Sequence, residues 1–191
     1  MPTSGEFELG LLTQAVPAAG DAAESALTEG FETGSLLRIE SLDDMRSAIN
    51  RVAAGAQRLM SLYTPDLEPE LYDQSPFLDI AKRFVLARNF AKIRVLVSDS
   101  RRLPRDNNRF LAMSRRLGSY IEVRMVQTPT PQRAASYLIA DDRMLVLRAR
   151  TPGWTGVADF NSPASARLLL NEFDVIWQAN LVDDDLRIAT R

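Results

Sequence analysis

The chain has 191 residues, of which 46% are hydrophobic and 25% charged, as is ordinary for a globular protein of one domain. It contains no cysteine and no histidine, which excludes disulfides, thiolate metal sites and catalysis by a cysteine or histidine side chain. The net charge of -2 is unevenly distributed: residues 1–37 carry six acidic and no basic side chains, and the remaining 154 residues carry 23 basic and 19 acidic ones.

Residues 1–35 contain few large apolar side chains, so we predict a disordered acidic leader there. The leader lacks a positively charged start followed by an apolar run, and no stretch approaches the roughly 20 apolar residues that cross a bilayer. We therefore expect a cytoplasmic protein with one domain over residues 36–180 and a C-terminal tail over residues 181–191.

From Leu36 onward, apolar residues recur with the spacings of strands and helices. The sequence predicts strands over residues 36–40, 58–64, 92–99, 121–126, 135–140, 144–150 and 156–160. Helices are predicted to begin at Ser41, Ser75, Asp106 and Ser162, because a capping side chain or a Ser-Pro pair precedes each helical stripe. This order predicts the α/β class, with a mixed β-sheet flanked by helices on both faces.

The last third of the chain contains a spaced set of residues around a predicted hairpin turn at Asp141 and Asp142. The set consists of Ala134, Ser136, Asp141, Gly156, Asp159, Asn171 and Glu172. It resembles the signature of the phospholipase D superfamily: His-x-Lys, four residues, Asp, then a Gly-Ser-x-Asn step and a helix. Ala134 stands at the histidine position, Ser136 at the lysine position and Asp159 at the asparagine position, and only the other members of the set match.

The resemblance covers residues 36–180 and, more narrowly, points to a group of bacterial domains classed as phospholipase-D-like. It implies one half of a phospholipase-D-like fold, with an extended hairpin over residues 148–154. In active members the histidine attacks phosphorus to form a covalent intermediate. Because Ala134 has no functional group and an identical second chain also lacks histidine, the resemblance implies no catalytic residue, no cofactor and no phosphodiester hydrolysis by the family mechanism.

The altered site is expected to be closed. Its strand presents a small, nearly apolar face made of Ala134, Ser136 and Leu138. Asp159 is expected beside this face, where its negative charge would disfavour phosphate. A cation would be available only if Arg133, Arg148 or Arg150 turned inward, and strand alternation puts Arg133 on the opposite face.

Two other charged sets are candidate binding sites. The first is a cluster of arginines, Arg101, Arg102, Arg105 and Arg109, which follows the strand over residues 92–99. Ligands of open α/β sheets bind at such strand ends, so the cluster is a candidate phosphate or nucleic-acid site, with a solvated loop as the alternative. The second is an oxygen-only metal site built from Asp141, Asp159 and Glu172, although no ligand spacing recommends one.

The leading functional prediction is a non-catalytic module that binds a second copy of itself or another protein. Family members commonly place two halves face to face, so we expect a homodimer that buries Ala134 and Leu138 near its two-fold axis. The alternatives are nucleic-acid or nucleotide binding through the arginine cluster, and a metal-dependent hydrolase built on the carboxylates.

Overall fold

The computed structural model describes residues 36–99, 101–102, 108–127, 136–149 and 152–180, so the predicted leader and tail lie outside the described residues. Seven strands form one sheet in the order β1-β7-β6-β5-β2-β3-β4. The strands are β1 (Leu36–Ile39), β2 (Leu59–Thr64), β3 (Lys92–Val97), β4 (Ile121–Met125), β5 (Ser136–Ala140), β6 (Met144–Arg148) and β7 (Gly156–Asp159). The helices are α2 (Leu42–Gly55), α3 (Pro69–Tyr72), α4 (Ser75–Ala87), α5 (Arg109–Arg116) and α6 (Pro163–Ala179).

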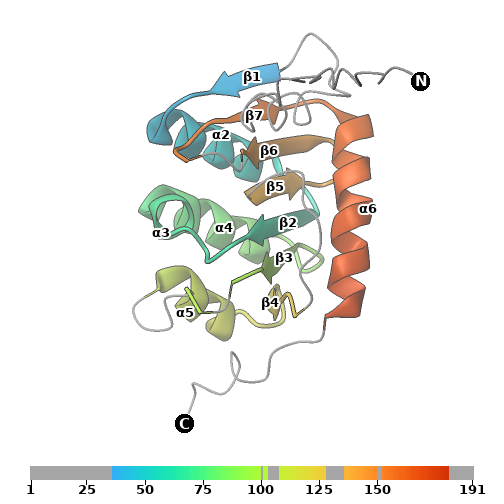
Figure 1. Ribbon diagram of the computed structural model, residues 1–191. Helices are drawn as coiled ribbons and strands as arrows, with labels where there is room; N and C mark the ends of the chain where they lie inside the picture. The colour runs from blue at the N-terminus through green and yellow to red at the C-terminus, as the bar shows by residue number, and fades with distance from the viewer. Residues whose placement is uncertain (1–35, 100, 103–107, 128–135, 150–151, 181–191) are drawn as a thin grey trace, which may run out of the picture.

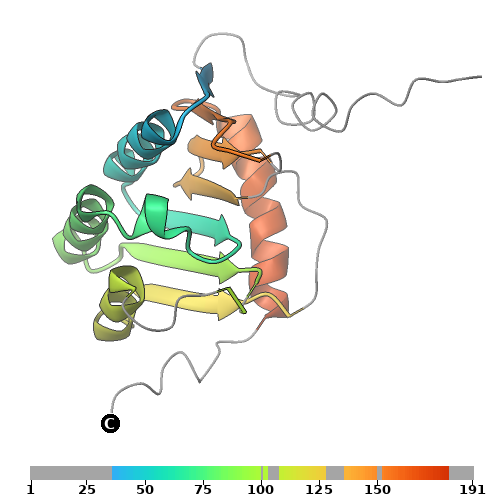
Figure 2. The ribbon, with the colours of Figure 1, turned by 60° about the vertical axis from the view of Figure 1, so that its left-hand side comes forward.

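Helices cover both faces of this sheet, as the sequence predicted. The long helix α6 covers one face, and α2, α3, α4 and α5 lie on the other (Figure 1 and Figure 2). We call these the α6 face and the four-helix face. Strands β2, β3 and β4 are parallel, whereas β5, β6, β7 and β1 add antiparallel strands beyond β2, which makes the sheet mixed.

Side chains of each strand alternate between two separate cores, because successive residues of a strand point to opposite faces. In β5, Leu138 and Ala140 pack in the core under the four-helix face. Tyr137 and Ile139 pack in the core under α6, where Tyr137 stacks on Tyr63 with ring centroids 5.2 Å apart. This alternation decides which residues of the hairpin can meet in one site.

The predicted helix starts hold with one correction. Ser41 caps α2, and its side chain accepts a hydrogen bond from the Asp44 backbone N–H at 3.1 Å. The helix predicted to begin at Asp106 begins at Arg109, because Asn108 provides the cap and accepts from the Leu111 N–H at 2.9 Å. Asp106 itself lies outside the described residues.

Candidate functional site

The candidate site lies on the four-helix face, at the edge of the sheet where β2 ends, β5 begins and β6 ends. Ser136 is paired with Arg148 across the β5–β6 hairpin, and Arg148 is paired with Gly156 across β6 and β7. Tyr63 is paired with Tyr137, so the next residue of β2, Thr64, lies level with Ser136. The sheet thus brings the family's lysine position, Ser136, beside an arginine and a threonine hydroxyl.

A buried ion pair fills this place. Arg148 turns inward, and its Nε lies 2.6 Å from Glu68 Oε1, with 15% of the Arg148 side chain and 6% of the Glu68 side chain exposed. Thr64 Oγ1 donates to Glu68 Oε2 at 3.1 Å, and Arg148 Nε donates to Ser136 Oγ at 3.4 Å. We call these four residues the Glu68–Arg148 cluster. Its cation already has an internal carboxylate as partner.

The loop that carries Glu68 has an unusual backbone. Leu67 has φ 66° and Glu68 has φ 24°, both in the left-handed region that side chains other than glycine rarely adopt. Local hydrogen bonds hold this turn: Leu67 N–H donates to Thr64 Oγ1, and Glu68 N–H donates to Asp66 Oδ1, each at 3.1 Å. The carbonyl of Glu68 accepts hydrogen bonds from the Leu71 and Tyr72 N–H groups, so the same residue begins that short helix. Strain of this kind persists only where surrounding contacts fix it.

Burial dominates the electrostatics of the cluster. It raises the pKa of Glu68 above the ordinary 4.5, although Arg148 and hydrogen bonds from Ser136 and Thr64 act to lower that pKa. Burial likewise raises the pKa of the neighbouring Tyr72 phenol well above its ordinary value. The cluster is therefore a nearly dry polar site that carries no net charge when both partners are ionised.

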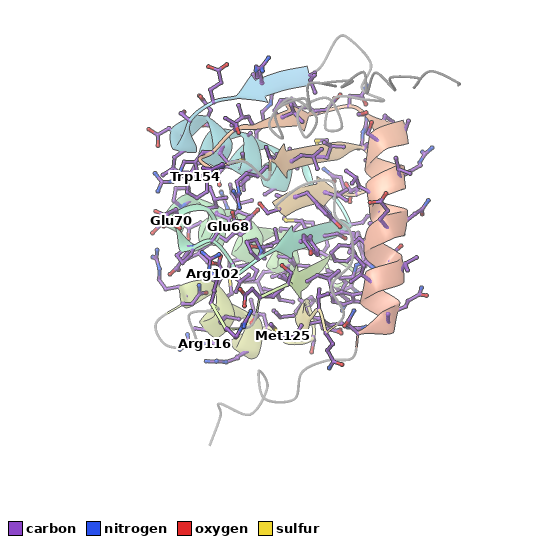
Figure 3. All side chains as sticks on the ribbon, in the orientation of Figure 1. Glu68, Glu70, Arg102, Arg116, Met125 and Trp154 are labelled. Carbon is purple, nitrogen blue, oxygen red and sulfur yellow. The ribbon has the colours of Figure 1, made fainter. Side chains whose placement is uncertain are left out.

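An aromatic side chain flanks the arginine. The Arg148 guanidinium lies 5.6 Å from the centroid of the Trp154 ring, which belongs to the segment between β6 and β7. Figure 3 shows Glu68 and Trp154 on the side of the sheet away from α6. Of the hairpin predicted over residues 148–154, residues 150–151 lie outside the described part.

Asp159 does not lie beside Ser136. Ser136 shares its face with Leu138 in the four-helix core, whereas Asp159 shares the opposite face with Val157, which packs under α6. Asp159 is also paired with Leu145, three residues along the sheet from the Ser136 row, or about 10 Å. The expected repulsion between Asp159 and a phosphate near Ser136 therefore does not arise in this fold. Ala134 lies outside the described residues.

Asp141 and Gly156 have roles in the backbone. The Asp141 carboxylate accepts hydrogen bonds of 2.8 to 3.0 Å from the backbone N–H groups of Gln57, Arg58 and Leu59. These bonds join the β5–β6 turn to the start of β2. A Cβ at Gly156 would lie 2.1 Å from the Leu147 carbonyl oxygen, so only glycine fits there. Both motif matches thus have structural explanations that require no phosphate.

The remaining motif residues lie on α6, away from the cluster. Asn171 is exposed and Glu172 is partly buried on this helix. Among the described residues, no group of three or more acidic side chains is placed to hold a metal ion. The structure therefore does not assemble Asp141, Asp159 and Glu172 into the carboxylate site that the sequence left open.

The described members of the arginine cluster are each paired with an aspartate. Nε atoms of Arg101, Arg102 and Arg109 lie 3.5, 3.4 and 3.0 Å from carboxylate oxygens of Asp99, Asp66 and Asp73, respectively. Arg109 also donates to the Asp73 carbonyl and to Ser75 Oγ, which ties the start of α5 to the loop before α4. Arg105 lies outside the described residues. Local pairing therefore offsets much of the positive charge of this loop.

A family model described as Domain of unknown function (DUF7931) matches residues 41–188. The chain belongs to this family. No curated protein matches it in sequence. None of the helices in the described residues is long and apolar enough to span a bilayer.

Solved structures place the fold among phospholipase-D-like proteins. Nuc from Salmonella typhimurium, a phospholipase D family member, is 16% identical with a TM-score of 0.50, over 72% of this chain and 90% of Nuc. NucT from Helicobacter pylori is 10% identical with a TM-score of 0.52, over 78% of this chain and 98% of NucT. TrmBL2, an archaeal chromatin protein with a novel mode of DNA binding, is 11% identical with a TM-score of 0.58, over 85% of this chain. The chain spans 59% of the length of TrmBL2, and at these identities each likeness shows the fold alone.

Proposed function

We propose that the chain is a non-catalytic phospholipase-D-like module that acts by binding, to a second copy of itself or to another protein. The observation that supports this most is the Glu68–Arg148 ion pair. It lies beside Ser136, which stands where the phospholipase D signature has its lysine. The absence of histidine from the whole sequence supports it independently. The site therefore lacks the histidine that attacks phosphorus in active phospholipase D members, and it lacks a cation that is free to hold the phosphate oxygens.

Physical chemistry also disfavours phosphate binding in the cluster. An entering phosphate would have to separate Arg148 from Glu68 and leave a carboxylate in a nearly dry site. Leaving one partner of a buried ion pair without its counter-ion costs roughly 3–5 kcal/mol. A phosphate group must therefore gain more than that from Arg148 and the two hydroxyl groups before it binds at all.

The exposed side of α6 is the surface we assign to self-association. Leu168 and Val175 are 47% and 70% exposed and lie seven residues apart, so they face the same way on the helix. Asn171 lies three residues after Leu168 and four before Val175, which is the spacing of the a and d positions that pack together in a coiled coil. The sequence analysis expected the homodimer to form through Ala134 and Leu138 instead. That expectation is wrong for Leu138, which is buried in the core of the chain and is not available to a partner.

Two measurements test this proposal. We expect the purified chain to leave bis(p-nitrophenyl) phosphate intact with and without added Mg²⁺, whereas hydrolysis lost in Asp159→Asn would support a carboxylate-based enzyme. We expect light scattering to report a dimer that Leu168→Glu with Val175→Glu converts to a monomer. Leu86→Glu, an equally exposed apolar position on α4, is the control and should leave the dimer intact. A clean monomer of the wild type at micromolar concentration would refute self-association and leave another protein as the partner.

Nucleic-acid binding is the alternative function. The fold shared with a DNA-binding chromatin protein favours it, and the aspartates that pair with Arg101, Arg102 and Arg109 weigh against it. If it is correct, binding of DNA or RNA must weaken steeply with salt and must be lost when Arg101 and Arg102 are both replaced by Glu. No shift of either nucleic acid at low salt would reject it.

A further inference from the structure

A cavity lies at the opposite end of the strands from the Glu68–Arg148 cluster. Its volume is about 270 Å³, and its walls include Leu59, Lys92, Arg94, Tyr120, Glu122 and Trp177. Because β2, β3 and β4 are parallel, their first residues gather at this end, and the last turns of α6 close one side. Leu59 begins β2 and Thr64 ends it, so about 16 Å separates this cavity from the cluster along the strand.

The cavity contains one positive charge more than its carboxylates balance. Arg94 pairs with Asp174 at 2.7 Å, and Arg124 pairs with Glu122 at 2.7 Å. Within the described residues no carboxylate forms an ion pair with Lys92. Its ammonium group donates to the carbonyl of Ser119 and lies 5.2 Å from the Tyr120 ring centroid. An ammonium group has three donor hydrogens, so Lys92 keeps donors for an anion.

The aromatic wall of this cavity is held rigidly. The Trp177 ring has the guanidinium groups of Arg124 and Arg94 at 4.0 and 5.4 Å from its centroid, and it stacks on Phe173 at 5.7 Å. Arg124 also donates to the carbonyl groups of Trp177 and Asn180, which fixes the end of α6 against β4. A wall that is already ordered loses little side-chain entropy when a ligand packs against it.

We propose that this cavity binds a small organic anion, namely a carboxylate that carries one aromatic ring. Lys92 would hold the carboxylate by a charge-assisted hydrogen bond, and Leu59, Tyr120 and Trp177 would contact the ring. A cavity of about 150 Å³ is known to hold benzene, so about 270 Å³ suits a single-ring compound that also carries a carboxylate rather than a nucleotide. This site is independent of the proposed non-catalytic function, because it uses none of the residues of the Glu68–Arg148 cluster.

The chain has built-in reporters for a test. It contains two lysines, Lys82 and Lys92, and two tryptophans, Trp154 and Trp177. One member of each pair lines the cavity, whereas Lys82 lies on α4 on the four-helix face and Trp154 lies near Arg148. Isotope labelling of lysine and tryptophan side chains therefore gives two site signals and two internal controls in one NMR titration.

We expect benzoate to shift the Lys92 and Trp177 signals along a saturable curve and to leave those of Lys82 and Trp154 in place. Benzylamine and benzyl alcohol, which match the ring without the anion, should produce no saturable shift. Lys92→Met should weaken benzoate binding about ten- to a hundredfold, because it removes one charge-assisted hydrogen bond. Lys92→Arg and Lys82→Met should bind benzoate nearly as the wild type does.

Three results would overturn the proposal. The first is a shift of all four signals in parallel or without saturation. The second is benzylamine binding as tightly as benzoate. The third is unchanged benzoate affinity in Lys92→Met while Trp177 still responds, which would assign the anion to another group.

Discussion

Replacing Arg148 with methionine removes the cation from the Glu68–Arg148 cluster and keeps a side chain of similar length. Glu68 would then hold an unpaired carboxylate with 6% of its side chain exposed, on a backbone with φ 24°. Removing one partner of a buried pair typically costs about 3–5 kcal/mol of unfolding free energy. For a domain of this size that loss lowers the Tm by roughly 6–20 °C.

The double variant Glu68→Gln with Arg148→Met separates the two contributions. Glutamine still accepts the hydrogen bond from Thr64 and carries no charge that burial must penalise, so we expect the double variant to recover much of the stability lost in Arg148→Met. Urea unfolding followed by circular dichroism measures all three unfolding free energies. Arg167→Met is the matched control, since Arg167 pairs with Asp142 at 3.0 Å on the exposed surface and its loss should cost less than about 1 kcal/mol.

The cost of Arg148→Met should also depend on pH in one direction. Arg148 lowers the pKa of Glu68, so that pKa rises further in the variant and Glu68 becomes neutral at a higher pH. The variant should therefore lose least stability in acid, where Glu68 is protonated, and most at neutral pH. A loss of the same size as in Arg167→Met, or a loss that does not change with pH, would refute the view that a buried charge pair holds this site.

Three more predictions follow from single contacts. Burial raises the pKa of Glu68, so the unfolding free energy of the wild type relative to that of Glu68→Gln should be highest below pH 4.5 and should fall as pH rises through that raised pKa, as urea unfolding at several pH values would measure. Gly156→Ala should cost roughly 3 kcal/mol in urea unfolding because its Cβ would meet the Leu147 carbonyl at 2.1 Å, whereas Gly118→Ala should be nearly neutral because its Cβ would lie 3.7 Å from the nearest atom, the Ser114 carbonyl oxygen. Asp141→Ala should lower the Tm more than Asp141→Asn, since Asn still accepts backbone hydrogen bonds and tolerates the φ of 55°; equal losses would contradict this.

The fold could be predicted from local patterns, whereas the candidate site could be predicted only in part. Strand alternation and helix caps gave the order of elements and the hairpin that sets Ser136 opposite Arg148. The four-residue helix α3 was missed, because four residues between two proline-containing turns show no periodicity. The sequence also did not predict that Glu68 belongs to the site. Its partner Arg148 is 80 residues further along the chain, and a Glu-Pro pair is typical of an exposed turn, so no local pattern indicates that Glu68 is buried. The motif spacing placed Asp159 beside Ser136 and was wrong there, because matching a motif along the chain ignores the face to which each residue of a strand points.

The two ends of this sheet differ in how their cations are balanced. At the carboxyl end of β2, Arg148 is largely buried and an internal carboxylate neutralises it, so its charge acts within the fold. At the amino end, Arg94 and Arg124 are paired in the same way, but Lys92 is exposed and forms no ion pair with a carboxylate of the described residues. An anion gains most where it meets an unmatched charge that need not be freed from a partner first. Anion binding in this chain is therefore expected at the end of the sheet opposite to the one that the phospholipase-D-like fold suggests.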